Sequence, residues 1–396
     1  MTLAGPRVLY LDVNFRFIDP TRQTMPLVYA HAADVTFYGP GYVSEAVLER
    51  GVEAFVGEHG PFDVVVITEL PLYHANPSLA QLSHYHSGFP ASQMRFWGTL
   101  RQYFLSYRGI KVAHLLESDY YNFTEKYIGP MRDSDAYFLS YNHQMIVARA
   151  DMPRIDEEIF GSRVNDNFHT FLSAAPDRFI PLVTSVLDSE LWLTPLDQRP
   201  RCWSVPGAPY LFRQEARRVL SASGLLGRQS WPTPFQIYSL MGKLGLKPFR
   251  RRVPLQIYNL LFNVDLEQTR FVYTCGSALG YPLRKFFEIP AHGCLLVAVP
   301  FFGAADLGFV DGHTMIAARP DQLPEVMRQL ERDPERAQTI ASAGRRMIFE
   351  RHGAVARGRQ LREVLDALVA GTFTRALWSD GEFVVQCRMS AKSARA

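Results

Sequence analysis

Arg284, Lys285 and Glu288 have side-chain types and a spacing that suit the binding of a phosphorylated ligand. In a helix these positions are i, i+1 and i+4, so Arg284 and Glu288 share one face and Lys285 lies beside them. Cations can neutralise a diphosphate, and a carboxylate can accept hydrogen bonds from both hydroxyls of a ribose. The alternative is a surface ion pair between Arg284 and Glu288, worth about 0.3–0.5 kcal/mol. These residues alone leave both interpretations open.

The surrounding segment predicts the elements that position these side chains. We expect a strand at residues 270–274, then a small-residue loop at 276–280, then a helix with Pro282 near its start and Gly293 at its end. Where a glycine-containing loop leads from a strand into a helix, unpaired N–H groups and the helix dipole point at the same place. The segment therefore predicts an anion site at the start of this helix.

Length and composition exclude several classes of protein. The chain has 396 residues and a formal net charge of +3, with 42 basic and 39 acidic side chains. The length predicts two domains of about 100–200 residues each, and the small basic excess argues against a dedicated nucleic-acid-binding protein. The four cysteines are widely spaced and indicate neither a zinc site nor a disulfide framework. With no signal peptide and no apolar stretch of the ~20 residues that cross a bilayer, we expect a soluble, cytoplasmic protein.

Apolar runs alternate with helical patterns along the chain. Uninterrupted runs are typical of strands buried on both faces of a parallel sheet. In the first half the expected strands are residues 7–13, 33–38, 63–68, 111–116 and 136–141, with a helix at 44–58. In the second half the expected strands are residues 270–274, 294–299 and 314–317, with helices at 320–331, 334–351 and 354–368. The last helix is expected to run back toward the first domain.

A proline-rich stretch at residues 195–209 separates the two halves. We expect an α/β fold with two Rossmann-like, doubly wound domains, residues 1–195 and 196–370, that face a central cleft. Residues 371–396 are expected to form a C-terminal tail, of which the last dozen residues are expected to be loose. Ligands of such folds bind at the carboxyl ends of the strands, so the chemistry is expected there.

Two consecutive stretches resemble a known family. They are RKFFEIPAHGCLLVAVPFFGAADLGFVDGHT at residues 284–314 and RPDQLPEVMRQLERDPERAQTIASAGRRMIFERH at residues 319–352. Both are similar to the nucleotide-sugar domain of bacterial glycosyltransferases, specifically the group 1 and spore-maturation-protein-B-like branch. The resemblance implies the GT-B fold and a nucleoside-diphosphate sugar as the donor substrate, with no further cofactor.

The resemblance also assigns donor-binding positions. Glu288 aligns with the second glutamate of the family's paired-glutamate motif, which holds the donor ribose. Gly280 stands where the first glutamate, which contacts the transferred sugar, would be, so the sugar and the stereochemical outcome stay open. A weaker resemblance at WSVPGAPYLFR, with an ordinary turn and a solvated arginine as the alternative, adds three positions on the diphosphate side. The full predicted donor set is Gly207, Tyr210, Arg213, Ser277, Gly280, Arg284, Lys285 and Glu288.

The acceptor and any general base are expected on loops that follow strands of the first domain. Glu117 and Asp119 follow the strand at 111–116, where a desolvated carboxylate could take a proton from an acceptor hydroxyl; a helix N-cap at Ser118 or Asp119 is the alternative. The candidates for acceptor contact are Asn14, Arg16, Glu69, His84 and His86. The histidine spacing matches no ordinary metal motif, so no metal site is expected.

The sequence therefore predicts a metal-independent glycosyltransferase that moves a sugar from a nucleoside-diphosphate sugar to the hydroxyl of a glycan, lipid-linked glycan, protein or small molecule. The alternatives are a catalytically inactive GT-B scaffold that acts as a carbohydrate- or nucleotide-binding partner subunit, and a sugar-nucleotide epimerase. The basic stretch at residues 243–252 predicts a solvated loop, with weak contact to the inner face of an anionic membrane as the alternative. The oligomeric state stays open.

Overall fold

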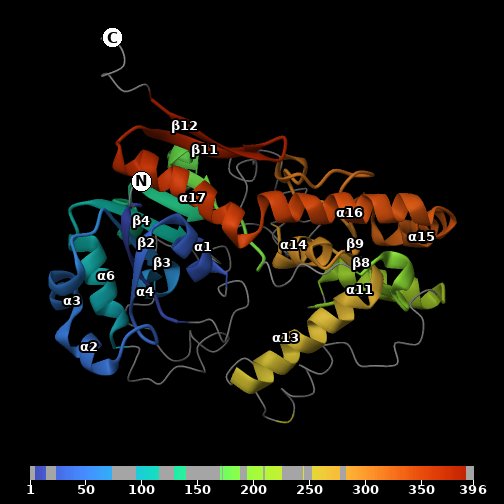
Figure 1. The fold of residues 1–396 in the computed structure, drawn as a ribbon, viewed down its shortest axis with the longest axis horizontal. Coiled ribbons are helices and arrows are strands. Elements are labelled where there is room, and N and C mark those ends of the chain that lie inside the picture. The colour runs from blue at the N-terminus through green and yellow to red at the C-terminus, as the bar shows by residue number, and fades with distance from the viewer. Residues whose placement is uncertain are drawn as a thin grey trace.

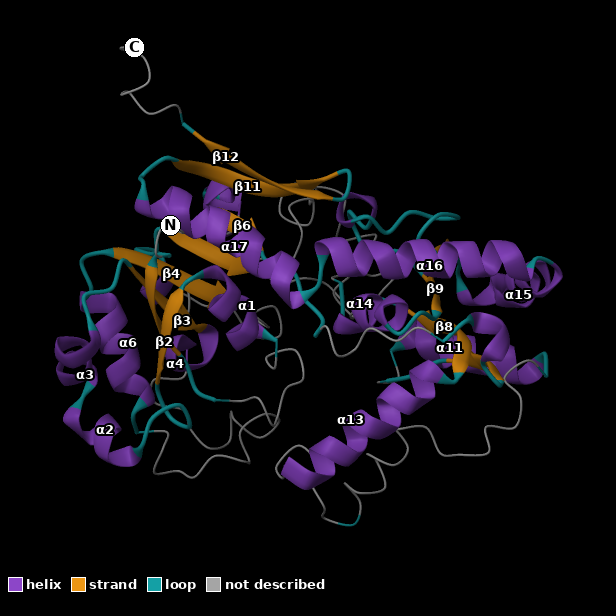
Figure 2. Cartoon of the chain, in the orientation of Figure 1, coloured by secondary structure: helices purple, strands orange, loops and turns teal. Residues whose placement is uncertain are grey.

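The structure is a computed structural model. It describes residues 5–14, 24–73, 95–115, 129–139, 170–171, 173–187, 194–207, 210–224, 244, 252–276 and 282–388. Within these residues the chain forms two parallel sheets with helices on both faces, and one antiparallel hairpin (Figures 1 and 2). Among the described helices, none has the length and apolar character that a membrane span requires.

The first sheet is entirely parallel, in the order β2-β1-β3-β4-β5-β6. Its strands are β1 (Arg7–Leu11), β2 (Asp34–Tyr38), β3 (Val64–Thr68), β4 (Ile110–Leu115), β5 (Ala136–Leu139) and β6 (Phe179–Pro181). The first five confirm the predicted strands, whereas β6 has only 3 residues and is too short to form a recognisable run. The strand order reverses beside β1, so the switch point lies between the carboxyl ends of β1 and β3.

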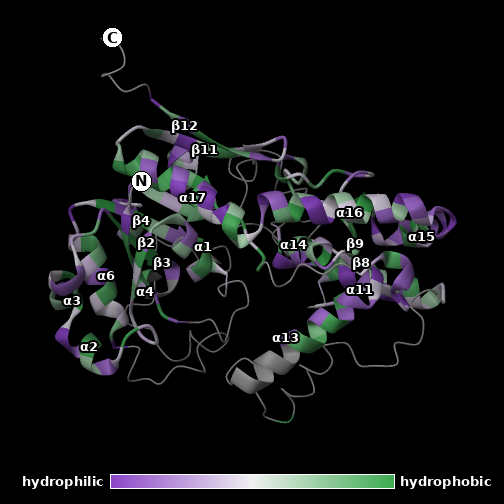
Figure 3. Cartoon of the chain, viewed as in Figure 1, coloured by the Kyte–Doolittle hydropathy of each residue, from purple (hydrophilic) through white to green (hydrophobic). Residues whose placement is uncertain are grey.

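Helices cover both faces of this sheet. They are α1 (Met25–Ala32), α2 (Glu45–Arg50), α3 (Val52–His59), α4 (Glu69–Tyr73), α6 (Trp97–Ser106) and the C-terminal α17 (Ala354–Val369). Leu9 and Val65 face the layer of α2, α3 and α6, while their neighbours Val8 and Val66 face α1 and α17. Burial on both faces is why the central strands β1 and β3 are apolar, whereas the edge strand β2 is only partly buried (Figure 3).

The prediction of a single helix at residues 44–58 is wrong, because two helices occupy this segment. Helix α2 ends at Arg50 and α3 begins at Val52. Gly51 between them has φ of 88°, which a helix cannot continue and which glycine adopts without steric cost. The apolar spacing on either side of Gly51 conceals this break in the sequence.

The second sheet is also parallel, in the order β10-β9-β8-β7. Its strands are β7 (Arg201–Ser204), β8 (Thr269–Thr274), β9 (Leu295–Ala298) and β10 (Ile316–Ala317). The helices are α11 (Leu211–Ala222), α13 (Arg252–Glu267), α14 (Arg284–Ala291), α15 (Leu323–Arg332) and α16 (Pro334–Arg351). These bounds confirm the strands and helices predicted for this half.

The C-terminal segment returns to the first domain. As predicted, α17 runs back, and it packs so closely on α1 that a Cβ on Gly358 would lie 2.3 Å from the Cβ of His31. The prediction of a tail at residues 371–396 is wrong for most of this segment, because β11 (Phe373–Ser379) and β12 (Glu382–Cys387) form a hairpin. Its turn is Asp380-Gly381, and both residues have positive φ. An Asp-Gly pair between two strands is a strong hairpin signal, but the hairpin was not predicted from the sequence.

The hairpin packs on both domains, because Trp378 belongs to the apolar cluster of the second domain and Ala376 to that of the first. The indole of Trp378, which is 3% exposed, donates a hydrogen bond of 3.1 Å to the carbonyl of Pro181 at the end of β6. Ala376 joins the apolar cluster that α1 and α17 form on the sheet. Figure 1 shows the hairpin lying over α17. The chain therefore crosses from the second domain back to the first before it ends.

Candidate functional site

The first turn of α14 lies at the carboxyl edge of the second sheet. Leu283 is the N-cap, Arg284 and Lys285 are the first two helical residues, and the first turn has no acidic side chain. Cations at a helix N-terminus oppose the helix dipole at a cost of about 0.3–1 kcal/mol each. An arrangement that is unfavourable by itself becomes favourable when an anion binds between the cations and the N–H groups.

Arg284 and Glu288 form a buried ion pair rather than the surface pair that the sequence left as an alternative. Nε of Arg284 donates to Oε1 of Glu288 at 2.5 Å, and the side chains are 7% and 10% exposed. Arg284 also donates to the carbonyl of Ser185 at 3.4 Å. Burial acts to raise the pKa of Glu288, but the charges of Arg284 and Lys285 outweigh it and the pKa is lowered. Glu288 is thus an anionic hydrogen-bond acceptor over the physiological range.

Lys285 is held differently from Arg284. Its ammonium lies 4.9 Å from the ring centre of Phe262 on α13, and it makes no hydrogen bond or ion pair with any residue that the structure describes. Burial, together with the nearby charges of Arg213 and Arg284, lowers its pKa to about 8 although Glu288 opposes the shift. Lys285 is only partly exposed, and a partly desolvated cation without a described acceptor is suited to an anionic ligand.

The loop after β7 reaches the same place through Gly207. Its φ is 98°, and a Cβ there would lie 2.4 Å from Cε of Lys285 and 2.9 Å from Nη1 of Arg213. The backbone conformation favours glycine at this position, and a Cβ would displace the flexible ends of Lys285 and Arg213. The close approach brings the loop backbone against two cationic side chains.

Two arginines of α11 complete the cationic cluster. Arg213 is 1% exposed, donates to the carbonyl of Cys275 at 3.3 Å and lies 4.8 Å over the ring of Tyr210. One turn later, Arg217 donates to the carbonyl of Gly207 at 2.7 Å and to that of Val205 at 2.8 Å. The structure therefore brings together six of the eight predicted donor residues and adds Arg217, whose i+4 spacing from Arg213 was the available signal.

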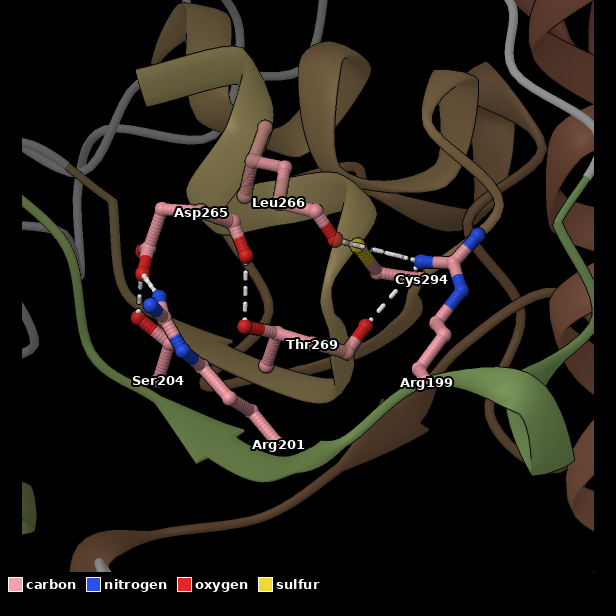
Figure 4. Close-up of polar contacts among 7 residues, drawn as sticks. All are labelled: Arg199, Arg201, Ser204, Asp265, Leu266, Thr269 and Cys294. Atoms are coloured by element: carbon pink, nitrogen blue, oxygen red, sulfur yellow. Dashed lines mark hydrogen bonds and ion pairs between the residues drawn. The ribbon is translucent and has the colours of Figure 1, made fainter. Parts of the chain in front are cut away.

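A second set of contacts holds α13 and α14 against the sheet, and Figure 4 shows those that involve α13. The guanidinium of Arg199 donates to the carbonyls of Leu266, Thr269 and His292 at 3.2, 3.0 and 2.6 Å. These carbonyls lie at the end of α13, the start of β8 and the end of α14, so one buried side chain fixes all three. Asp265 ties α13 to β7 by accepting from Arg201 and, at 2.9 Å, from Ser204.

The end of α14 was predicted from Gly293. The N–H of Gly293 donates to the carbonyl of Pro290 at 2.8 Å, and that of Cys294 donates to the carbonyl of Ile289 at 3.2 Å. This pair of hydrogen bonds is the Schellman arrangement that terminates helices. It confirms the predicted helix end, and Pro282 lies just before the N-cap.

The start of α14, with its cationic cluster, lies near the interface between the domains. Leu283 and Phe302, both from the second domain, pack against the apolar cluster of the first domain that contains Leu72 and Leu139. Helix α14 therefore begins where the two domains meet. Side chains that follow strands of the first domain are consequently near its first turn.

Among the acceptor candidates, the structure describes Asn14 and Glu69. Asn14 follows β1, and its amide donates to the carbonyl of Gly41 at 3.1 Å, which links the loops after β1 and β2. Glu69 begins α4 directly after β3 and is fully buried. The remaining predicted residues lie outside the described part of the chain: Arg16, His84, His86, Glu117, Asp119, Ser277 and Gly280. Their roles stay predictions.

Buried polar side chains at the same edge of the first sheet were not selected from the sequence. Asp12, at the end of β1, accepts hydrogen bonds from Thr68 and, at 3.2 Å, from Tyr42. His114 on β4 is fully buried, and its Nδ1 lies 3.3 Å from the hydroxyl of Tyr29. Asp12 and His114 each interrupt an apolar run near its end, and this interruption could have identified them in the sequence. They form a polar floor next to the switch point, where ligands of such sheets bind.

No group of three or more His, Cys, Asp or Glu side chains is arranged to hold a metal ion within the described residues. The donor set at α14 consists of arginine and lysine with one carboxylate, which favours an anion over a cation. Metal independence of the reaction stays a prediction.

Residues 256–363 match the model of a glycosyl transferase-like family. This region includes most of α13, all of α14 and the helices that follow. No curated protein sequence matches the chain. The family match thus covers the donor-site helix but less than half of the chain, and it does not distinguish the spore-maturation-protein-B-like branch.

Solved structures share the fold of this chain over most of its length. The Anabaena protein HepE, in complex with UDP, is 14% identical, and the match covers 91% of this chain and 99% of that one with a TM-score of 0.53. Sucrose-phosphate synthase from Thermosynechococcus elongatus is 10% identical, and the match covers 93% and 100% of the two chains with a TM-score of 0.52. The chain has a two-domain, Rossmann-like GT-B fold.

Proposed function

We propose that this chain is a glycosyltransferase that moves a sugar from a nucleoside-diphosphate sugar to an acceptor hydroxyl. The observation that carries the proposal is the position of Lys285, a partly buried ammonium without a described hydrogen-bond partner that lies against the Gly207 backbone beside Arg213. The glycosyl transferase-like family match over α14 supports the same reaction class. The alternative of an inactive scaffold gains no specific support.

In the reaction, the bond between the anomeric carbon and the phosphate oxygen breaks, and a bond to the acceptor oxygen forms. Negative charge grows on the leaving diphosphate during this step. Lys285, Arg213 and the N–H groups of the first turn of α14 would offset that charge from fixed positions, which is the form of stabilisation that contributes most in many enzymes. These groups need no reorganisation because Arg199 and Phe262 already hold the surrounding elements.

Glu288 would hold the ribose of the donor. Its carboxylate is ionised, fixed in direction by Arg284 and only 8% exposed. A carboxylate held in this way can accept hydrogen bonds from two neighbouring hydroxyls, as acidic residues do in dinucleotide sites. The pair therefore provides selectivity for a ribonucleotide, while Lys285 provides affinity for its phosphates.

The acceptor loses one proton in the transfer. Glu117 or Asp119 would receive it if the enzyme inverts configuration, and an oxygen of the donor phosphate would receive it if the enzyme retains configuration. Several points remain predictions made from the sequence: the acceptor class, the sugar, metal independence, peripheral membrane contact and the cytoplasmic location.

The test is nucleotide binding followed by transfer. Because HepE was crystallised with UDP, calorimetric titration with UDP comes first, then GDP and ADP, each with and without EDTA. The sugar conjugate of the tightest nucleotide is then assayed for release of the diphosphate. An EDTA-insensitive nucleotide with diphosphate release supports the proposal. Absence of binding by every nucleotide contradicts it, and conversion to a different sugar nucleotide without diphosphate release would indicate an epimerase.

A further inference from the structure

A cavity of about 520 Å³ opens in the second domain, away from the donor site. It lies between the segment before β7, the start of β8, the end of α15 and the start of α16. These are the amino ends of the strands, whereas Lys285 lies at the carboxyl ends. Its floor is formed by four apolar side chains, each at most 5% exposed: Leu196, Phe271, Leu330 and Ala337. The volume is typical of sites for small molecules.

The rim of this cavity is acidic. Asp197, Glu331 and Glu335 line it, and none of the three forms an ion pair with a residue that the structure describes. The single cation of the lining is Arg270, and its guanidinium donates to the carbonyls of Arg199 at 2.9 Å and Asp197 at 3.5 Å. Arg270 is thus directed at the backbone. Three carboxylates against one arginine leave a net negative rim above an apolar floor.

We propose that this cavity binds a small apolar molecule that carries one ammonium or guanidinium group. The apolar body would cover Leu196, Phe271 and Leu330, and the cation would lie among the rim carboxylates. Apolar contact favours burial of the body by about 25 cal/mol per Å², and the charges favour a cation over an anion of the same shape. A nucleotide or a phosphorylated sugar is excluded because its charge has the wrong sign.

The wall of the cavity is connected to the donor-site helix through hydrogen bonds. Arg270 donates to the carbonyl of Arg199, Arg199 donates to that of His292 at 2.6 Å, and Nδ1 of His292 donates to that of Glu288 at 2.8 Å. Burial lowers the pKa of His292, so the ring is neutral and Nδ1 carries the proton. The cavity therefore lies beside the hydrogen bonds by which Arg199 joins α13, β8 and α14. Binding in the cavity does not require a nucleotide.

The experiment uses the full chain and methyl NMR, with Leu196, Leu330 and Ala337 as reporters. The probe is benzylammonium, and benzyl alcohol and benzoate serve as its neutral and anionic counterparts. Saturable shifts at these three methyl groups are expected with benzylammonium. Weaker binding is expected with benzyl alcohol, and no binding with benzoate.

The charge requirement is tested with the double variant Glu331→Gln, Glu335→Gln. Both side chains are exposed, so the fold should be unaffected, and affinity for benzylammonium should fall about three- to tenfold. The matched control is Glu325→Gln, which removes an exposed charge from α15 outside the cavity and should leave affinity unchanged. Equal affinity of the double variant, equal binding of benzoate, or no saturable shift at the reporters would overturn the proposal.

Discussion

Replacing Lys285 with methionine should weaken nucleotide binding while it stabilises the fold. The ammonium makes no described hydrogen bond, and its stem packs on Phe262, a contact that methionine can preserve. Loss of one charge-assisted hydrogen bond to a phosphate costs about 1.5–3 kcal/mol, so the Kd for UDP should rise about 10- to 150-fold. An ordinary structural lysine would give the opposite effect on stability.

The gain in stability follows from the pKa of Lys285, which falls from 10.5 to about 8 on folding. That difference corresponds to about 3 kcal/mol, which partial exposure of the side chain makes an upper limit. Below pH 8 the folded and unfolded chains both hold the proton, so the full cost is present. Between pH 8 and 10.5 the unfolded chain binds more protons, so the free energy of unfolding rises with pH. The methionine variant should be more stable at pH 7 and lack this rise.

Three measurements check this prediction. Urea unfolding at pH 7 and pH 9 gives the free energies, and calorimetry gives the Kd for UDP. Because a bound diphosphate favours the charged ammonium, UDP binding at pH 8 should also take up about half a proton, seen as a dependence of the enthalpy on the buffer. The control is Lys111→Met, a lysine over the ring of Phe104 in the first domain. Unchanged UDP affinity together with reduced stability in Lys285→Met would refute the reasoning.

Three further variants test the neighbouring features. Glu288→Gln should lower the free energy of unfolding at pH 7, measured in urea, by about 3 kcal/mol, because Arg284 becomes an uncompensated buried charge. The pKa of Glu288 is lowered, so the ion pair stabilises the fold above the ordinary carboxyl pKa and this stabilisation is lost in acid. The free energy of unfolding of the variant should therefore fall less steeply as the pH is lowered. Gly207→Ala should weaken UDP binding, because its Cβ would displace the ends of Lys285 and Arg213. The control Gly224→Ala, with positive φ and open space, should lose about 1 kcal/mol of stability and leave UDP binding unchanged; equal effects of the two variants on UDP binding would contradict the site. Trp378→Ala should cost about 3–5 kcal/mol, measured in urea, and a neutral result would show that the hairpin is not part of the core.

Local pattern explains which parts of the fold could be predicted. Strands β1, β3 and β5 are buried on both faces along almost their whole length, so each appears as an uninterrupted apolar run. The two helices at 44–58 were predicted as one, because periodicity continues across Gly51 while its φ of 88° does not allow a helix. The hairpin at Asp380-Gly381 carried a turn signal, but a two-stranded ribbon is stable only against a core, and its contact with Pro181 joins residues 197 positions apart.

The candidate site shows the same division. Arg284, Lys285 and Glu288 lie within one helix, so their shared face follows from spacing alone. Arg217 was not selected, because an arginine on an amphipathic helix is ordinarily a solvated charge. Only the folded loop reveals that it holds the carbonyls of Val205 and Gly207.

The class of fold, the position of α14 and the types of side chain at its first turn could be predicted, because they depend on periodicity and on residues close together in the chain. The folded chain was needed to learn that the Arg284–Glu288 pair is buried, that Lys285 lies against Gly207, and that α17 and the hairpin pack on the first domain. Burial and the approach of distant loops set the pKa values and the orientation of the charged side chains. These properties depend on contacts between residues far apart in sequence, which no local pattern encodes.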